Sequence, residues 1–465
     1  MRLDPALRSA LARALPADRR LEDPADCLPY GYDNSRRFHA PDMVVFPLGH
    51  DEVVAVVQAC HATGTPLVAR GRGTNTTGAS VPVAGGVVMS LERMNRILEY
   101  RPADRLMVVE AGCINSDVQQ CAAADGLFWA PDPTSAGYST VGGNLACGAG
   151  GPRAVKYGTA RESVLGLRAV TGAGTALVTG GRTTKGVVGY DLTRLLVGSE
   201  GTLAVITEAT LRLLPRPSQQ RTLRACYTNA ASAVAAVVRI MGQPETPAAL
   251  EFMDGTAVRL AQAWQDTGVP PGTGALLLID VDGSDDTVAL AQQAVGRAAA
   301  DGDGLVELRA AADAAEAAAL WACRKALSPS LRQLAPKKVN EDVAVPVSQL
   351  PTLLSALEAL SAEHDLQIVN FGHAGNGNLH VNLLADPEDP RQMEAVSACL
   401  VAVFRKVLAL GGTLSGEHGV GIDKRPYVGW EIDPLTLGVM QDLRSRFDPR
   451  GILNPDKTLP VTAPT

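Results

Sequence analysis

Three polar stretches rich in glycine interrupt the first half of the chain, and they constrain its fold most strongly. They are residues 70–78 (RGRGTNTTG), 131–151 and 198–202 (GSEGT). Glycine lets backbone N–H groups approach phosphate oxygens without interference from a Cβ atom. Three such turns converging on one extended ligand would explain the pattern, and plain surface loops would explain it equally well.

Two common nucleotide sites do not fit these glycines. A dinucleotide fingerprint of the G-x-G-x-x-G type must lie between a strand and a helix. Gly71 and Gly73 match it, but Thr76 stands at the third glycine and the chain continues through Pro82 to another strand. A phosphate loop with G-K-[ST] is also absent from the sequence. A Rossmann NAD site and a Walker site are therefore excluded.

Hydrophobic periodicity and turn residues predict two regions of mixed helix and strand. In the first we expect a helix at 53–62, strands at 66–69, 86–91 and 106–110, a helix at 117–124 and a strand at 203–207. Residues 131–151 have few large apolar side chains, so we expect a loop there and no core element. After 215–217 (PRP) we expect helices at 230–241, 287–300, 311–327 and 350–363, and strands at 274–281 and 304–308. The turn-rich segment 448–457 is expected to return to the first region.

Composition narrows the class of protein. The chain has 465 residues, 46% apolar and 20% charged, with a formal charge of −7, which is ordinary for a multidomain globular protein and argues against nucleic-acid binding. Its eight cysteines form no C-x-x-C pair, which fits free thiols in a reducing cytoplasm. Neither a secretion signal nor an apolar run of about 18 residues is visible. We expect a cytoplasmic protein, with peripheral contact at the inner face of the membrane left open.

Three of the seven histidines lie in two short polar motifs near the C-terminus, 372–382 (GHAGNGNLHVN) and 415–421 (SGEHGVG). In a strand, His380 and Asn382 would share one face, and His373 could fold back to it across the glycine turn. Two imidazoles and Glu417 form an N/N/O ligand set suited to Zn²⁺ or a similar divalent ion. One histidine among glycines is more often a hydrogen-bonded turn residue, but the cluster with a glutamate favours a metal site.

The glycine-rich stretches, together with 189–192 (GYDL), resemble the FAD-binding domain of the vanillyl-alcohol oxidase superfamily. More closely, residues 41–460 are similar to the group of glycolate oxidase flavin subunits, FAD-linked D-lactate dehydrogenases and D-2-hydroxyglutarate dehydrogenases. This resemblance implies an α+β fold with a two-subdomain FAD-binding domain of the PCMH type and an α+β substrate or cap domain with an antiparallel sheet. We place these domains at 1–215 and 216–420, with 421–465 returning to the FAD domain.

The resemblance also implies where FAD binds. The first loop would hold the pyrophosphate, the second stretch the isoalloxazine, and two later residues the adenosine end, with one further contact from the C-terminal segment. In that order, the expected residues are Arg70, Gly71, Arg72, Gly73, Thr74, Asn75, Thr76, Thr77 and Gly78; Pro131, Thr134, Gly142, Gly143 and Asn144; Gly201 and Ile206; and Asn454. Some members attach FAD through a histidine in the first loop. This loop has none, so we expect non-covalent FAD.

Residue by residue, the resemblance implies that His373, His380 and Glu417 hold the metal, with zinc preferred over Mn²⁺ or Fe²⁺. Asn382 corresponds to a substrate contact and His418 to the catalytic base. Arg324, in the segment 321–325 (WACRK), corresponds to an arginine that binds the substrate carboxylate, although a solvated charge on an alanine-rich helix explains it equally well. Asn376 departs from the usual aspartate of the motif.

The sequence thus predicts an FAD-dependent dehydrogenase that oxidises a small D-2-hydroxy acid by hydride transfer to flavin N5 while His418 accepts the hydroxyl proton. We expect D-lactate or glycolate first and D-2-hydroxyglutarate next, with a quinone, an electron-transfer flavoprotein or a cytochrome as acceptor. A homodimer is left open. The alternatives are an oxygen-using flavin oxidase of the alditol or sugar type, a non-catalytic electron-relay flavin subunit, and a flavin-free metallohydrolase.

Overall fold

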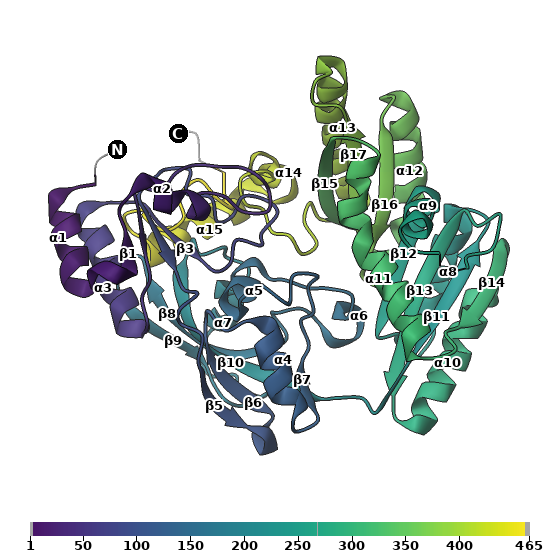
Figure 1. Cartoon of the computed structure of the whole chain (residues 1–465), viewed down its shortest axis with the longest axis horizontal. Coiled ribbons are helices and arrows are strands. Elements are labelled where there is room, and N and C mark those ends of the chain that lie inside the picture. The colour runs from purple at the N-terminus through teal and green to yellow at the C-terminus, as the bar shows by residue number, and fades with distance from the viewer. Residues whose placement is uncertain (1–2, 267, 461–465) are drawn as a thin grey trace. The chain divides into compact units, whose positions relative to one another are not determined.

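The computed structural model describes residues 3–266 and 268–460, and the chain divides into two compact units (Figure 1). The first unit comprises Met1–Gly150, Gly158–Arg216 and Glu417–Thr465. The second comprises Gly151–Tyr157 and Pro217–Gly416. The chain therefore crosses between the units four times, and the short segment 151–157 belongs to the second unit although the residues on both sides of it belong to the first.

The first unit begins with a small sheet of order β1-β2-β4-β3, in which β2, β3 and β4 are parallel. Its elements are α1 (Pro5–Ala14), β1 (Arg20–Leu21), α2 (Pro24–Cys27), β2 (Met43–Val45), α3 (His50–Thr63), β3 (Leu67–Arg70) and β4 (Val87–Ser90). The parallel strands carry apolar side chains such as Val45 and Val87, which share one core with Val56 of α3, and all three are fully buried. The first glycine-rich stretch leaves β3 at Arg70 and therefore starts at a fixed edge of this sheet.

A second, antiparallel sheet has the order β5-β6-β10-β8-β9, with β7 paired to β10. The strands are β5 (Ile97–Arg101), β6 (Leu106–Glu110), β7 (Leu127–Trp129), β8 (Val164–Thr171), β9 (Ala176–Gly180) and β10 (Ala204–Pro215). The helices α4 (Asn115–Ala123), α5 (Val141–Cys147) and α7 (Leu192–Leu196) contribute to its core. The third glycine-rich stretch immediately precedes β10, the strand at the centre of this sheet.

The last segment of the chain, with α14 (Val428–Glu431) and α15 (Pro434–Phe447), packs within the first unit. Leu453 forms a parallel bridge with Leu67 of β3. Lys457 Nζ donates to Val81 O at 2.7 Å, and its side chain is fully buried. These contacts close the chain onto the sheet from which the first glycine-rich stretch emerges.

The second unit is built on a seven-stranded antiparallel sheet of order β14-β11-β13-β12-β16-β17-β15. Its strands are β11 (Gln219–Tyr227), β12 (Ala249–Asp254), β13 (Ala275–Gly283), β14 (Leu305–Ala310), β15 (Lys337–Ala344), β16 (Gln367–Gly372) and β17 (Asn378–Ala385). Its helices are α6 (Ala154–Tyr157), α8 (Ala230–Gly242), α9 (Gly255–Trp264), α10 (Asp285–Ala300), α11 (Ala314–Ser330), α12 (Leu350–Glu363) and α13 (Pro390–Ala409). On one face, α9 and α11 pack over Met253, Leu278 and Phe371.

Most predicted helices and strands are present within a few residues of their expected ends, but residues 131–151 are not entirely loop. They contain α5, whose Val141 and Leu145 are fully buried in the core of the second sheet. Thr140 caps this helix by accepting the Gly143 N–H, and Gly148 ends it in a left-handed conformation with φ of 67°. Two apolar side chains one turn apart, with a cap at each end, are enough to form a short core helix in a glycine-rich stretch.

Candidate functional site

The three glycine-rich stretches meet in the first unit. A Cβ atom on Gly71 would lie 2.4 Å from Thr140 Oγ1, so the first and second stretches are in direct contact. Asn75 Nδ2 lies 3.6 Å from Cys147 Sγ at the end of α5. From the third stretch, Glu200 N–H donates to Ala146 O at 2.8 Å. All three stretches therefore surround one region of this unit.

Asn75 organises the first stretch. Its Oδ1 accepts the N–H groups of Thr77 at 2.8 Å and Ala79 at 3.0 Å, which fixes the turn from within. Its Nδ2 donates to the backbone oxygen of His418 at 2.9 Å, and the Ile422 N–H donates to Thr77 O at 2.8 Å. The segment that carries the predicted base is therefore tied by its backbone to the predicted pyrophosphate loop.

Other predicted cofactor residues stabilise this arrangement. Asn454 Nδ2 donates to Ala79 O at 2.8 Å and to Glu200 O at 2.7 Å, so it joins the first and third stretches. Gly201 has a φ of 71° and open space at its Cβ position. Pro131 O accepts the side-chain N–H of Asn115 at 3.0 Å.

Two predicted cofactor residues have structural explanations. Gly142 packs tightly, because a Cβ there would lie 2.6 Å from the Cβ of Ala111. Ile206 lies in the hydrophobic core of the second sheet with 6% exposure. Packing alone is therefore enough to account for the choice of residue at these two positions.

The residues of the first unit fit a polar, extended cofactor. Among the described residues, the buried atoms Thr76 Oγ1, Asn144 Nδ2 and Ser139 Oγ have no hydrogen-bond partner. Each such atom costs about 1–3 kcal/mol unless a ligand or water satisfies it. Gly73 has a φ of 65°, and a Cβ there would collide with the Arg70 guanidinium at 2.1 Å. A loop with no room for a side chain at Gly73, beside unsatisfied polar atoms, suits a dinucleotide such as FAD.

A separate polar cluster lies on the sheet of the second unit. Glu251 of β12 is fully buried, and its Oε1 accepts the Nδ1 proton of His373 at 2.6 Å. Its Oε2 lies 2.7 Å from Arg324 Nη2, and the Arg324 guanidinium stacks 4.8 Å from the Phe371 ring centre. Burial by itself raises the pKa of the Glu251 carboxyl, but the charges of His373 and Arg324 outweigh it and lower the pKa to about 2.

The two histidines of the 372–382 motif lie beside each other in this cluster. Their ring centres are 5.2 Å apart, and a nitrogen of one lies within 4.8 Å of a nitrogen of the other. With Nδ1 of His373 held by Glu251, a cation at this ring would bind Nε2. Asp342 of β15 stands opposite His380 in the strand register, with its Oδ1 4.0 Å from His380 Nδ1. The chemistry of this donor set fits a divalent ion.

Asn382 lies two residues beyond His380 on β17 and is fully buried. Its Nδ2 donates to Val369 O at 3.0 Å and His380 O at 2.9 Å, while its Oδ1 has no partner within the described part of the chain. Arg324 Nε is likewise buried and unpartnered there. An acceptor and a donor thus remain for a ligand beside the histidines. Asn376, the departure from the motif, is exposed in the turn.

The remaining predicted residues, Glu417 and His418, begin the last segment of the first unit. They follow Gly416 of the second unit, whose N–H donates to Asp342 O at 3.2 Å. Sequence reasoning missed Glu251 and Asp342. The available signal for Glu251 was a lone carboxylate in the apolar run 248–253 (AALEFM). The available signal for Asp342 was its alternation with Asn340.

Comparison with known proteins assigns a class to this architecture. Residues 41–180 match a family described as FAD binding domain, and residues 216–458 match one described as FAD linked oxidases, C-terminal domain. The solved structure of p-cresol methylhydroxylase has a TM-score of 0.81 at 15% identity, covering 100% of this chain and 99% of its own. An alkyldihydroxyacetonephosphate synthase has a TM-score of 0.78 at 21% identity, covering 98% and 86%. The fold is that of a PCMH-type flavoprotein, as predicted.

Curated relatives narrow the class. Glycolate oxidase subunit GlcD of Bacillus subtilis is 38% identical over 92% of both chains. D-lactate dehydrogenase of Anaerostipes hadrus is 34% identical over 90% of this chain and 89% of its own. D-2-hydroxyglutarate dehydrogenase of Stutzerimonas stutzeri is 33% identical over 98% and 99%. The chain belongs to this family of FAD-linked oxidoreductases, and FAD is its cofactor. In the part of the chain that is described, every helix is too short or too polar to span a bilayer.

Proposed function

We propose that the protein oxidises a small D-2-hydroxy acid to the 2-oxo acid, with FAD as the hydride acceptor and a divalent cation at the substrate. D-lactate and glycolate are the first candidates and D-2-hydroxyglutarate is the next. Relatives named for all three substrates cover about nine tenths or more of the chain, which supports this substrate class. FAD binds without a covalent bond, since the 70–78 loop has no histidine.

The single observation that carries this proposal is the buried carboxylate of Glu251. It contacts His373 at 2.6 Å and Arg324 at 2.7 Å, so one side chain orients both a predicted metal ligand and a predicted substrate-binding cation. A carboxylate that accepts the Nδ1 proton of a histidine fixes the ring with Nε2 available and raises its basicity as a ligand. A core needs no such arrangement, because burying three ionisable groups together is costly.

His373, His380 and Glu417 would hold the cation, with Zn²⁺ preferred over Mn²⁺ or Fe²⁺. A bound divalent cation supplies Lewis acidity to the hydroxyl and carboxylate oxygens of the substrate. Arg324 pairs with the substrate carboxylate through its free Nε, and Asn382 Oδ1 accepts a hydrogen bond from the substrate. Both atoms are buried and unpartnered among the described residues, so a ligand that contacts them removes two desolvation costs.

His418 would remove the hydroxyl proton. Its backbone oxygen accepts from Asn75 Nδ2 at 2.9 Å and Thr77 Oγ1 at 3.4 Å, so the base is held by the same loop that would bind the FAD pyrophosphate. Neutral imidazole accepts a proton readily near neutral pH because its ordinary pKa is about 6.5. FAD held by the first unit would supply the acceptor for the C2 hydride.

An anaerobic titration of the purified holoenzyme tests this function. Flavin absorbance is followed while D- and L-lactate, glycolate and D-2-hydroxyglutarate are added, before and after EDTA. We expect bleaching by a D-hydroxy acid or glycolate, little by L-lactate, and loss of bleaching after EDTA. Bleaching that EDTA does not affect, together with peroxide formation in air, would favour a flavin oxidase. Failure of every hydroxy acid to bleach the flavin would favour an electron-relay subunit.

A further inference from the structure

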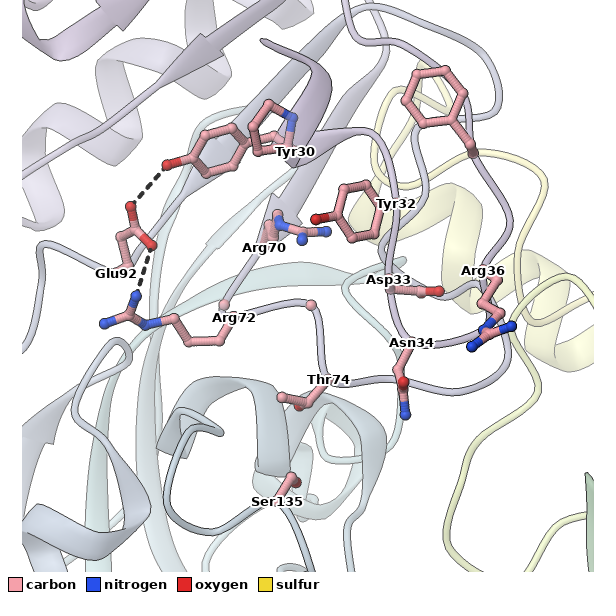
Figure 2. Close-up of a pocket in the computed structure, with 14 residues that line it drawn as sticks. Tyr30, Tyr32, Asp33, Asn34, Arg36, Arg70, Arg72, Thr74, Glu92 and Ser135 are labelled. Carbon is pink, nitrogen blue, oxygen red and sulfur yellow. Dashed lines mark hydrogen bonds and ion pairs between the residues drawn. The ribbon is translucent and has the colours of Figure 1, made fainter. Parts of the chain in front are cut away.

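Each unit has a further polar feature. In the first unit it is a pocket lined by Tyr30, Arg70 and Ser135, among other residues (Figure 2). The start of the 70–78 loop also lines this pocket, so it belongs to the candidate FAD site. In the second unit it is Asp342 of β15, whose side chain is fully buried. A carboxylate is costly to bury unless neighbouring groups compensate its charge, so the contacts of Asp342 indicate what it does.

Asp342 lies in a row of residues across the end of the seven-stranded sheet, where β15 is the last strand in the order. On one side, β17 places His380 opposite Asp342 in the strand register. On the other side, the segment 413–416 forms an antiparallel bridge with β15, and the Gly416 N–H donates to Asp342 O at 3.2 Å. Residues opposite each other on adjacent strands bring their side chains together. Asp342 therefore lies between one proposed metal ligand and the chain that leads directly to another, Glu417.

Both oxygens of the Asp342 carboxylate accept a hydrogen bond. Oδ1 accepts from Asn378 Nδ2 at 2.6 Å, and Oδ2 accepts from the Ser415 hydroxyl at 3.3 Å. A Cβ on Gly416 would lie 2.3 Å from Asn378 Nδ2 and 3.0 Å from Asp342 Oδ1, so glycine lets the chain pass close to the carboxylate. These contacts fix the carboxylate in place and hold the chain immediately before Glu417.

The two histidines of the 372–382 motif each have a buried carboxylate near the same ring atom. Glu251 Oε1 lies 2.6 Å from Nδ1 of His373, and Asp342 Oδ1 lies 4.0 Å from Nδ1 of His380. A carboxylate at Nδ1 orients the ring with Nε2 towards a cation and makes Nε2 a better ligand. The distance at His380 is too long for a hydrogen bond, so the attraction between this pair is electrostatic and weaker than that at His373.

We propose that Asp342 is a positioning residue of the metal site, which orients His380 through Nδ1 and holds the chain at Gly416, from which Glu417 follows. One side chain thereby acts on two of the three proposed ligands. This inference rests on the proposed function, because it needs the cation that these ligands would hold. The alternative is that Asp342 binds the ion itself, since one of its oxygens and a nitrogen of His380 lie within 4.8 Å of each other. Both oxygens already accept hydrogen bonds, which favours positioning over ligation.

The test measures Zn²⁺ affinity by isothermal titration calorimetry, on FAD-loaded protein that has been treated with a chelator. Asp342→Asn keeps the shape of the side chain and the backbone contact to Gly416 but removes the charge. We expect the Zn²⁺ Kd to rise about tenfold. The rise should be smaller than that in Glu251→Gln, because the contact of Asp342 with its histidine is longer. Asp365→Asn, exposed in the turn before β16, is the control and should match the wild type.

Ser415→Ala tests the contact on the other side of Asp342. It removes the hydroxyl that donates to Oδ2 but leaves the carboxylate charge in place. The Zn²⁺ Kd should rise by roughly twofold to fivefold, the usual effect of one hydrogen bond. An unchanged Kd in this variant would overturn the part of the proposal that concerns the chain before Glu417.

Co²⁺ in place of Zn²⁺ separates positioning from ligation, because its visible absorption depends on the ligands and geometry of the site. At saturating Co²⁺, the spectrum of Asp342→Asn beyond the flavin bands should match that of the wild type. A changed spectrum would show that Asp342 is a ligand. A loss of FAD and a lower Tm in the metal-free variant would show that its role is to stabilise the fold. Either result would overturn the proposal.

The same titrations distinguish this proposal from the proposed function. Wild-type Zn²⁺ affinity in Asp342→Asn would overturn the positioning role alone and leave the proposed function standing. A wild-type protein that binds no Zn²⁺ would overturn the positioning role together with the part of the metal ion in the proposed function.

Discussion

The two units present polar groups in different ways. In the first, the candidate cofactor site is made mostly of backbone and of glycines in conformations that disfavour a side chain, as at Gly73 with its φ of 65°. In the second, the cluster around Glu251 is made of side chains from one sheet, the turn after β16 and helix α11, oriented by contacts of 2.6 and 2.7 Å. The first type of site is damaged by adding a Cβ atom, and the second by removing a charge. Substitutions of these two kinds should therefore separate FAD binding from substrate chemistry.

The largest effect is expected from His418→Ala. This variant should keep its FAD, because it retains the backbone oxygen of His418 that accepts from Asn75 of the loop. Flavin reduction by substrate in the stopped flow should fall by about 10²–10⁴-fold, the usual contribution of a general base. His364→Ala, in the second unit at the end of α12, is the matched control. Normal bleaching of the His418 variant would remove this residue from the mechanism.

Glu417→Ala should abolish most metal binding, because one of three proposed protein ligands is lost. We expect the affinity for the metal to fall about 100-fold or more, and mass spectrometry of the purified protein should show correspondingly less bound metal. FAD content should not change. A variant that keeps one metal per chain at wild-type affinity would show that Glu417 is not a ligand.

Glu251→Gln tests the carboxylate behind His373 without changing its shape. Metal affinity should fall by about 10–100-fold, as for other partners of a ligating histidine. Glu358→Gln, an exposed carboxylate on α12, should leave affinity unchanged. If FAD content falls in the Glu251 variant while metal affinity stays normal, the proposal that Glu251 supports metal binding and not FAD binding is incorrect.

Gly73→Ala acts on the backbone-made site. A left-handed conformation costs an L-residue about 1–2 kcal/mol, and the added Cβ meets the Arg70 guanidinium. We expect FAD affinity, measured by titration of the apoprotein, to fall about tenfold, with metal affinity unchanged. Gly429→Ala, whose Cβ would have open space, is the control. Equal FAD affinity in the two variants would contradict the need for glycine at position 73.

The smallest effect concerns Lys457, which helps close the C-terminal segment onto the first unit. Burial lowers its pKa to about 8, although Glu200 opposes the shift. Between pH 8 and 10.5 the unfolded lysine keeps its proton while the folded one loses it, so the free energy of unfolding should rise with pH. Relative to Lys457→Met, wild-type stability in urea should increase by up to about 1 kcal/mol per pH unit. A pH-independent difference would contradict this.

The sequence predicted a large part of the fold because the signals were local. The helix 350–363 and the strand 106–110 match α12 and β6 at both ends. The helix α5 was missed because composition over 131–151 outweighed the two apolar residues, Val141 and Leu145, that form its buried side.

The residues of the candidate sites also differ in whether a local sequence signal identifies them. The glycine-rich stretches and the histidine motifs can be recognised because each is a short continuous sequence motif. Glu251 cannot, because its partner His373 lies 122 residues away and the other residues of its run, 248–253, are apolar. Pairings between distant strands depend on sheet order, which local patterns do not contain.

The central claim is that one divalent cation and the flavin act on the same substrate. The most direct measurement removes the metal with a chelator, retains the FAD, and titrates Zn²⁺ back while the rate of anaerobic flavin reduction by the best hydroxy acid is recorded. We expect that reduction stops without metal and returns in full at one Zn²⁺ per flavin. Full-speed reduction by the metal-free holoenzyme would contradict it.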